Sequence, residues 1–154
     1  MKYQTATLKD LQVIFEIVQE TIKQVYPKYY PTEVVNFFLE LHSLKNIEKD
    51  IVEENVGILI NENIIVGTGC YIDNHITRVY VLPKFQGKGY GTFIMNTLEK
   101  LISLNHNTSI LDASLPASYL YEKLGYKTIE HCKQEVENQR VLVYEVMEKK
   151  LLII

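Results

Sequence analysis

Apolar residues recur at helical spacing in the first third of the chain. A stripe of them, three or four positions apart, predicts a helix that starts after Thr7 and ends before Pro27. A short strand at 3–6 is expected before it, a second helix at 32–42 and a short helical piece at 44–50. The stripe consists of Leu11, Ile14, Phe15, Val18, Ile22 and Val25.

From residue 57 onward, short apolar runs separated by turn residues predict strands, and only two stretches return to helical spacing. This order of elements is typical of an α+β protein built around one mixed sheet. The expected strands are 57–60, 64–71, 75–81 and 108–114, followed by two that flank 136–139, and the expected helices run from about 89 to 105 and from 116 to 125.

Composition and charge limit the class of protein. The 154 residues predict a single domain, 1–154. A net charge of −3 argues against nucleic acid as a partner, and no apolar stretch is long enough for a membrane span. Cys70 and Cys132 lack metal-ligand spacing and the four histidines are scattered, so we expect no metal site and a reducing, cytoplasmic location.

Three of the seven glycines lie within five residues, in the stretch QGKGYG at 86–91, between a predicted strand and a predicted helix. Such a loop forms an anion site, because its N–H groups point outward and the helix dipole adds positive charge. Glycine leaves room for phosphate oxygens and permits positive φ. Lys88 could add a formal charge.

Two common phosphate-binding patterns do not fit this loop. The dinucleotide fingerprint needs a third glycine where Thr92 stands, and the P-loop needs glycine in place of Leu82 and Ser or Thr in place of Gly89. A nucleotide-binding protein is therefore disfavoured. A glycine-rich turn without a ligand remains open from the loop alone.

The wider stretch VYVLPKFQGKGYG resembles the acyl-CoA-binding signature of the GNAT superfamily of N-acetyltransferases. Gln86, Gly89 and Gly91 fill its (Gln/Arg)-x-x-Gly-x-(Gly/Ala) pattern. The later stretch SLPASYLYEKLGY is similar to the family's second landmark, Asn-x-x-Ala-x-x-x-Tyr-x-Lys-x-Gly-(Phe/Tyr). Its matches are Ala117, Tyr121, Lys123, Gly125 and Tyr126, and Ser114 stands in place of the Asn.

The resemblance implies an α/β/α sandwich. Its central, mixed and mostly antiparallel sheet of about seven strands would be splayed between the fourth and fifth strands and flanked by about four helices. The resemblance also implies acetyl-CoA as co-substrate, with the pantetheine arm on the backbone of the fourth strand and the pyrophosphate on N–H groups of 86–92. The implied cofactor residues are Val79, Tyr80, Val81, Gln86, Gly87, Lys88, Gly89, Tyr90, Gly91, Thr92, Ser114 and Tyr121.

The implied activity is transfer of an acetyl group to an amine by direct attack on the thioester. Tyr121 matches the family's proton donor to the departing thiolate, and His75 matches the point on the strand where some members place a general base. A backbone N–H near Val81 would donate to the thioester oxygen. The alternatives are a packed aromatic for Tyr121 and a solvated histidine after a turn for His75.

The acceptor amine is the part that the motifs constrain least. Tyr29, Tyr30 and Phe37 lie in the segment that walls the acceptor pocket in the family, although core packing is the alternative. The acidic run 49–54 could attract a cationic amine or form a solvated face. We expect a small-molecule, peptide or protein amine as partner, and the apolar tail LLII suggests a homodimer. The alternative to an enzyme is a non-catalytic acyl-CoA-binding module.

Overall fold

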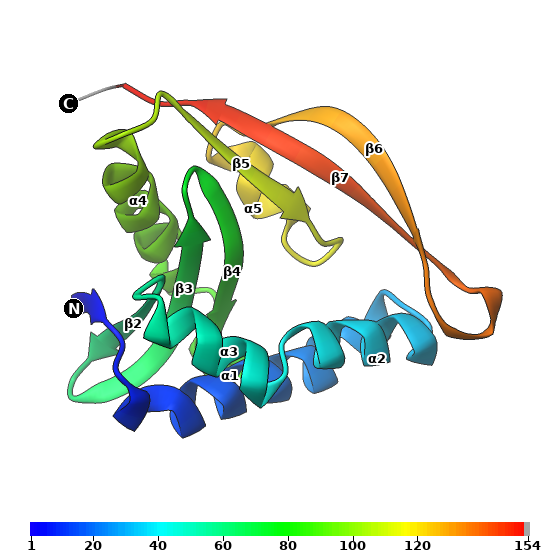
Figure 1. The fold of residues 1–154 in the computed structure, drawn as a ribbon, viewed down its shortest axis with the longest axis horizontal. Helices are drawn as coiled ribbons and strands as arrows, with labels where there is room; N and C mark the ends of the chain where they lie inside the picture. The colour runs from blue at the N-terminus through cyan, green and yellow to red at the C-terminus, as the bar shows by residue number, and fades with distance from the viewer. Residues whose placement is uncertain (153–154) are drawn as a thin grey trace.

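The computed structural model describes residues 1–152, which form one seven-stranded sheet with helices on both faces (Figure 1). The strand order is β1-β2-β3-β4-β5-β7-β6, and every neighbouring pair is antiparallel except β4 and β5. The predicted fold class is confirmed. The strands are β1 (Lys2–Thr5), β2 (Val56–Asn61), β3 (Ile64–Ile72), β4 (His75–Val81), β5 (Thr108–Ala113), β6 (Lys127–Glu135) and β7 (Val141–Lys150).

Two apolar clusters, one on each face of the sheet, form the core. The first lies under the helices that precede β2, and the second under the helices that follow β4 and β5 (Figure 1). Each helix buries one apolar stripe, as its spacing predicts. The helices are α1 (Leu11–Val25), α2 (Thr32–Leu41), α3 (Leu44–Val52), α4 (Tyr90–Ser103) and α5 (Ser118–Lys123).

A β-bulge in β4 separates its two halves. The register shifts so that Arg78 lies opposite Cys70 while Ile76 lies opposite Tyr71, which leaves Thr77 as an extra residue. A bulge bends the strand and increases its twist. Accordingly β4 pairs with β5 only at two residues, His75 and Ile76, and then diverges from it. The predicted splay between the fourth and fifth strands is therefore present.

The sequence also led to predictions about the apolar tail, the two cysteines and membrane spans. Leu151 packs against the second apolar cluster and Leu152 is exposed, whereas Ile153 and Ile154 of the apolar tail lie outside the described residues. Cys70 and Cys132 are both free thiols. Within residues 1–152, no helix combines the length and the hydropathy needed to cross a bilayer.

Candidate active site

A cavity of about 510 Å³ lies beside the diverging half of β4, between α1, the glycine loop, α5 and the N-terminus of α4. We call it the loop cavity. Every predicted cofactor residue except Lys88 lines it. Lys88 lies outside the lining, with its Nζ 5.8 Å from the centre of the Phe85 ring. The residues that the motif selects are thus brought together on one concave surface.

The glycine loop adopts the backbone conformation that only glycine takes readily. Gly87 and Gly89 have φ of 77° and 84°, and a Cβ at either position would meet no protein atom within 4 Å. Glycine is therefore required here by the positive φ and by nothing else in the protein. The space in front of the loop stays free of side chains.

The first turn of α4 supplies the donors of the loop cavity. The first helical hydrogen bond runs from Phe93 N–H to Gly89 O, at 3.0 Å. The N–H groups of 90–92 therefore have no intrahelical partner. Gln86 N–H already donates to Pro83 O at 3.2 Å. The available amides therefore start at Gly87, whereas the sequence predicts that they start at Gln86. Unpaired amides at a positive helix end fit a phosphate group.

The edge of β4 that faces the gap has no strand among residues 1–152 paired to it after Ile76. Leu82 N–H donates to Val66 O on β3, at 3.2 Å. Because alternate residues of a strand direct their backbone groups to opposite sides, those of Val79 and Val81 face the gap. Val81 O accepts from the side-chain amide of Gln86 at 2.9 Å. The Gln86 side chain thus ties the loop to the end of the strand.

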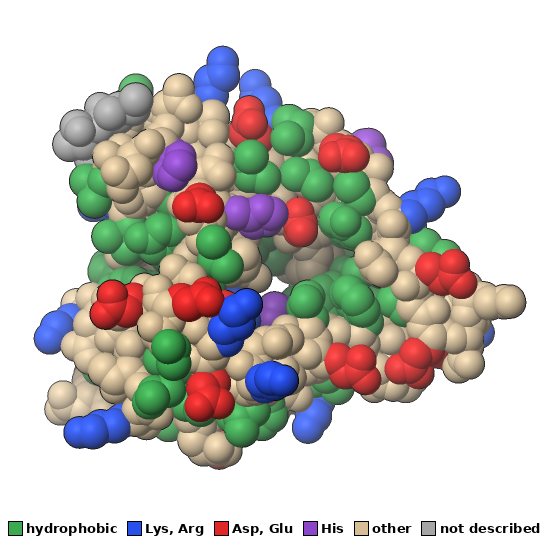
Figure 2. All heavy atoms as spheres, in the orientation of Figure 1, with side chains coloured by type: hydrophobic (Ala, Val, Ile, Leu, Met, Phe, Trp, Pro, Cys, Tyr) green, Lys and Arg blue, Asp and Glu red, His purple; other side chains and the backbone are tan. Residues whose placement is uncertain are grey.

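A second cavity, of about 550 Å³, lies between β4, α2, α3 and the hairpin of β6 and β7. We call it the hairpin cavity. Figure 2 shows a hollow in the centre of this face, with histidine, acidic and hydrophobic side chains around it. The two cavities share one wall, and the side chains in it border both. The shared residues are Tyr26, Val79, Tyr80, Ser114, Ala117 and Tyr121.

Tyr121 lies on α5 in this shared wall, in a buried position. Burial, with Tyr26 nearby as a smaller cause, raises the pKa of Tyr121 above its ordinary value. Its hydroxyl therefore keeps its proton at neutral pH. A protonated hydroxyl between two cavities can donate a proton to a group that leaves either of them.

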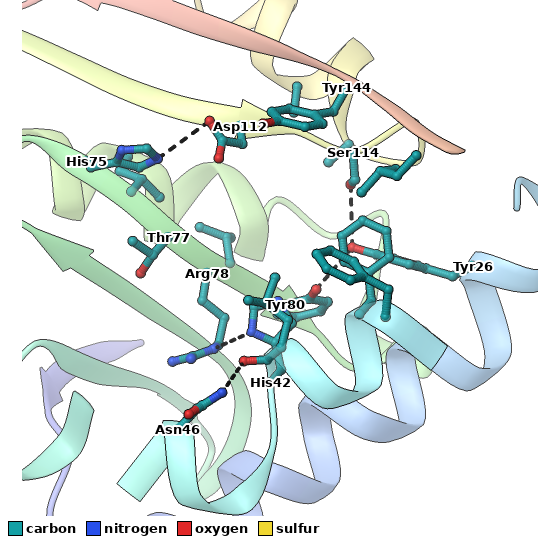
Figure 3. Close-up of a pocket in the computed structure, with 18 of the residues that line it drawn as sticks. Tyr26, His42, Asn46, His75, Thr77, Arg78, Tyr80, Asp112, Ser114 and Tyr144 are labelled. Atoms are coloured by element: carbon teal, nitrogen blue, oxygen red, sulfur yellow. Dashed lines mark hydrogen bonds and ion pairs between the residues drawn. The ribbon is translucent and has the colours of Figure 1, made fainter. Parts of the chain in front are cut away.

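His75 lies at the other end of the hairpin cavity, where β4 and β5 pair (Figure 3). Its Nε2 is 3.7 Å from Asp112 Oδ1 on β5, and both side chains are largely exposed. The carboxylate lies close enough to orient the imidazole. The structure thus places His75 on a cavity wall, with an acidic neighbour that the sequence did not reveal.

The three residues predicted to wall an acceptor pocket separate in the structure. Phe37 lines the hairpin cavity, whereas Tyr29 is half-exposed and lines the loop cavity. Tyr30 lines neither. It is buried, and its hydroxyl accepts a hydrogen bond from Leu115 N–H at 2.7 Å. Tyr30 therefore holds the segment between β5 and α5 in place.

Sequence reasoning did not single out Tyr26, His42 or Arg78, and it considered Asp50 only as part of the acidic run 49–54, yet all four line the hairpin cavity. The Tyr26 hydroxyl lies 3.1 Å from that of Tyr80 and donates to Ser114 Oγ at 3.4 Å. The density of tyrosines before α2 was the available signal for Tyr26. Arg78 stands inside a predicted strand, and a cation buried there needs a partner.

The structure offers no ready metal centre in the part of the chain that it describes. Across residues 1–152, no three His, Cys, Asp or Glu side chains are grouped so that they could hold an ion.

The fold has many solved counterparts. A GCN5-related N-acetyltransferase from Rhodopseudomonas palustris has a TM-score of 0.88 at 22% identity, with 97% of this chain and 95% of that chain covered. The PaiA N-acetyltransferase of Thermoplasma acidophilum, solved with coenzyme A, has a TM-score of 0.75 at 19% identity, with coverage of 97% and 98%. A ribosomal-protein-alanine N-acetyltransferase from Brucella melitensis has a TM-score of 0.74 at 20% identity, with 98% of this chain and 100% of that chain covered.

At these identities the solved structures establish the fold alone, and no curated protein sequence is significantly similar to the chain. The family is established by sequence. The model of the family described as acetyltransferase (GNAT) domain matches residues 25–151. The chain belongs to the GNAT acetyltransferase family, as its two motifs predict.

Proposed function

We propose that the protein transfers the acetyl group of acetyl-CoA to an amine. The observation that carries this proposal is the shared wall between the two cavities, which brings Tyr121 to both of them. The loop cavity has the donors for a pyrophosphate, and the hairpin cavity has room for a second substrate. Coenzyme A in the solved Thermoplasma protein supports the choice of cofactor.

The cofactor residues follow from the unpaired backbone groups. The N–H groups of 87–92 would hold the pyrophosphate, because they point outward at a positive helix end. The backbone of Val79 and Val81 would pair with the amide-bearing arm, as an added strand would. Ser114 lies in the shared wall, within reach of both substrates.

Acetyl-CoA supplies the acetyl group as a thioester, and three groups of the chain act on the transfer. An alkyl amine with a pKa near ~10.4 is mostly protonated at neutral pH, so it must lose a proton, which His75 accepts directly or through water. A backbone N–H near Val81 donates to the thioester oxygen. Tyr121 gives a proton to the departing sulfur.

The test of the function is release of free thiol from acetyl-CoA over a panel of small amines, peptides with free N-termini and lysine-containing proteins. We expect release with at least one class of acceptor, together with binding of coenzyme A in calorimetry. Binding without release from any acceptor would favour the non-catalytic acyl-CoA-binding module. No binding at all would overturn both functions.

The role of His75 has its own test. We expect His75→Gln to remove or shift the lower limb of the pH–rate profile, because that limb reports the base that must be unprotonated. His131→Gln, at an exposed position outside both cavities, is the matched control. A lower limb that is the same in His75→Gln and in the wild type would exclude His75 as the base.

A further inference from the structure

A buried chain of three side chains lies in the wall of the hairpin cavity, and no step of the proposed reaction uses it. Arg78 donates from Nη2 to Asp50 Oδ2 at 2.9 Å. It also donates from Nε to His42 Nδ1 at 3.1 Å (Figure 3). Arg78 and His42 are each 5% exposed. The three residues come from β4, α3 and the end of α2.

The hydrogen bond from Arg78 fixes the tautomer of His42. A guanidinium group only donates, so Nδ1 must be the accepting nitrogen. A neutral imidazole that accepts at Nδ1 carries its proton on Nε2. Burial, and then the charge of Arg78, lowers the pKa of His42 to about 3, so the ring is neutral at physiological pH. His42 is therefore a hydrogen-bond donor and not a base.

The donor atom is free among the described residues, and its side chain lines the hairpin cavity. Nε2 forms no hydrogen bond with the described residues and is not enclosed by them, and His42 lines the cavity. Its ring packs edge-on against Tyr80, with ring centres 5.4 Å apart. Tyr80 lies between Val79 and Val81, whose backbone groups face the gap between β4 and β5. Tyr80 therefore connects the His42 ring to the part of β4 that borders both cavities.

The charges around His42 select an oxygen as its partner. Arg78 polarises the imidazole and makes Nε2–H a stronger donor, while it opposes a cation at the same place. Asp50 is engaged by Arg78, so the acidic run 49–54 does not offer this carboxylate to a cationic amine.

Arg78 also keeps Nη1 buried without a partner among residues 1–152. An ion pair with an unsatisfied donor is poorly explained by stability alone. We propose that His42 binds the acceptor through Nε2–H, and that the acceptor is an amine that also carries a carbonyl or carboxylate oxygen. This inference rests on the proposed function. In it, His42 contacts the acceptor, and Arg78 and Asp50 are positioning residues.

The first test compares L-leucinamide with isopentylamine, which differ by one carboxamide group. We expect His42→Phe to lower kcat/KM for leucinamide about five- to tenfold more than for isopentylamine, which is the loss of one hydrogen bond. The intrinsic reactivities of the two amines cancel in this ratio. His42→Gln, whose amide retains an N–H, should restore part of the preference, and His131→Phe should leave the ratio as in the wild type.

Equal losses for both amines in His42→Phe would overturn the inference and leave the acetyltransferase intact, because thiol release would continue. Failure of the function would instead appear as the absence of thiol release with every acceptor. The second test needs no turnover. In ¹⁵N spectra of the histidine rings, His42 should show a proton on Nε2, with a signal that shifts when leucinamide is added to the protein with coenzyme A and not when isopentylamine is added.

A proton on Nδ1 in these spectra, or a Nε2 signal that leucinamide does not move, would overturn the inference even if no acceptor had yet given thiol release. In Arg78→Met the proton is expected to distribute between the two ring nitrogens, because the donor to Nδ1 is gone. An unchanged tautomer in that variant would exclude Arg78 as the residue that positions His42.

Discussion

Tyr121 and His42 have opposite surroundings, although both side chains are buried beside the same residue, Tyr80. Burial keeps the proton on Tyr121, while burial and a neighbouring cation keep a second proton off His42. Each side chain is thereby held in a single protonation state at neutral pH. At the scale of the residue, Tyr121 can thus act as a proton donor in the reaction, whereas His42 can act only as a hydrogen-bond donor.

For Tyr121 we expect the Tyr121→Phe variant to turn over at least tenfold more slowly, because it loses the proton for the departing sulfur. The affinity for coenzyme A should change little, since the ring remains. Steady-state kinetics and calorimetry measure the two effects. Tyr119→Phe, on the same short helix but exposed and outside both cavities, is the control. Unchanged turnover in Tyr121→Phe would remove this residue from the mechanism.

For His42 we expect a loss of stability in acid. Its pKa is lowered from about 6.5 in the unfolded chain to about 3 in the fold, so its contribution is complete above pH 6.5 and is lost as the pH falls toward 3. At pH 5 the loss relative to pH 7.5 is about 2 kcal/mol. Urea unfolding at the two pH values measures it.

In His42→Gln this part of the pH dependence should disappear, and in His131→Gln it should persist. If His42→Gln loses as much stability between pH 7.5 and pH 5 as the wild type does, His42 is not the neutral, buried group described here.

The site residues that the sequence revealed and those that it did not differ in how far apart along the chain their partners lie. Tyr121 and Gln86 belong to local motifs, so their spacing alone predicts their place. His42 and Arg78 are 36 positions apart, and Arg78 and Asp50 are 28 apart. Nothing in the local pattern relates them, because their partnership depends on how α2 and α3 pack on β4.

At the scale of the element, the glycine loop and the helix behind it were predictable and the bulge was not. An alternating strand places Ile76, Arg78 and Tyr80 on one face. The extra residue Thr77 instead turns Ile76 toward α4, while Tyr80 stays in the cluster under α1–α3. When both faces of a strand are buried, its sequence does not alternate between apolar and polar residues. An extra residue therefore does not change the hydrophobic pattern in a way that could be recognised.

The loop predicts a specific effect of Gly89→Ala. Residue 89 has positive φ, so an alanine costs about 1–2 kcal/mol of backbone strain. Its methyl group would meet no protein atom within 4 Å and would stand in the loop that we propose to hold the pyrophosphate. We expect the affinity for coenzyme A, measured by calorimetry, to fall at least tenfold.

Gly125→Ala is the matched control for this substitution. Its φ is 95°, and its methyl group would meet only the Lys149 side chain, away from both cavities. It should lose similar stability and keep its affinity for coenzyme A. Equal losses of affinity in both variants would show that strain, and not the loop, controls binding.

At the scale of the whole molecule, the two cavities are lined largely by different elements and have only the residues of one wall in common. In the proposed function each substrate has a cavity of its own, so that both could be bound together for direct attack. We expect initial-rate plots against both substrates to give intersecting lines. Parallel lines, the sign of an acetylated enzyme intermediate, would contradict this.

The single parallel pairing of β4 and β5 also affects how the protein persists in a cell. Two residue pairs join the halves of the sheet, so a molecule that bonds to the open edge of β4 completes a ladder that the chain alone leaves unfinished. Thermodynamic linkage then raises the melting temperature whenever such a molecule binds only the native state. We expect the abundance of the protein in a cell to rise with the supply of such a molecule, because less of the protein is then unfolded.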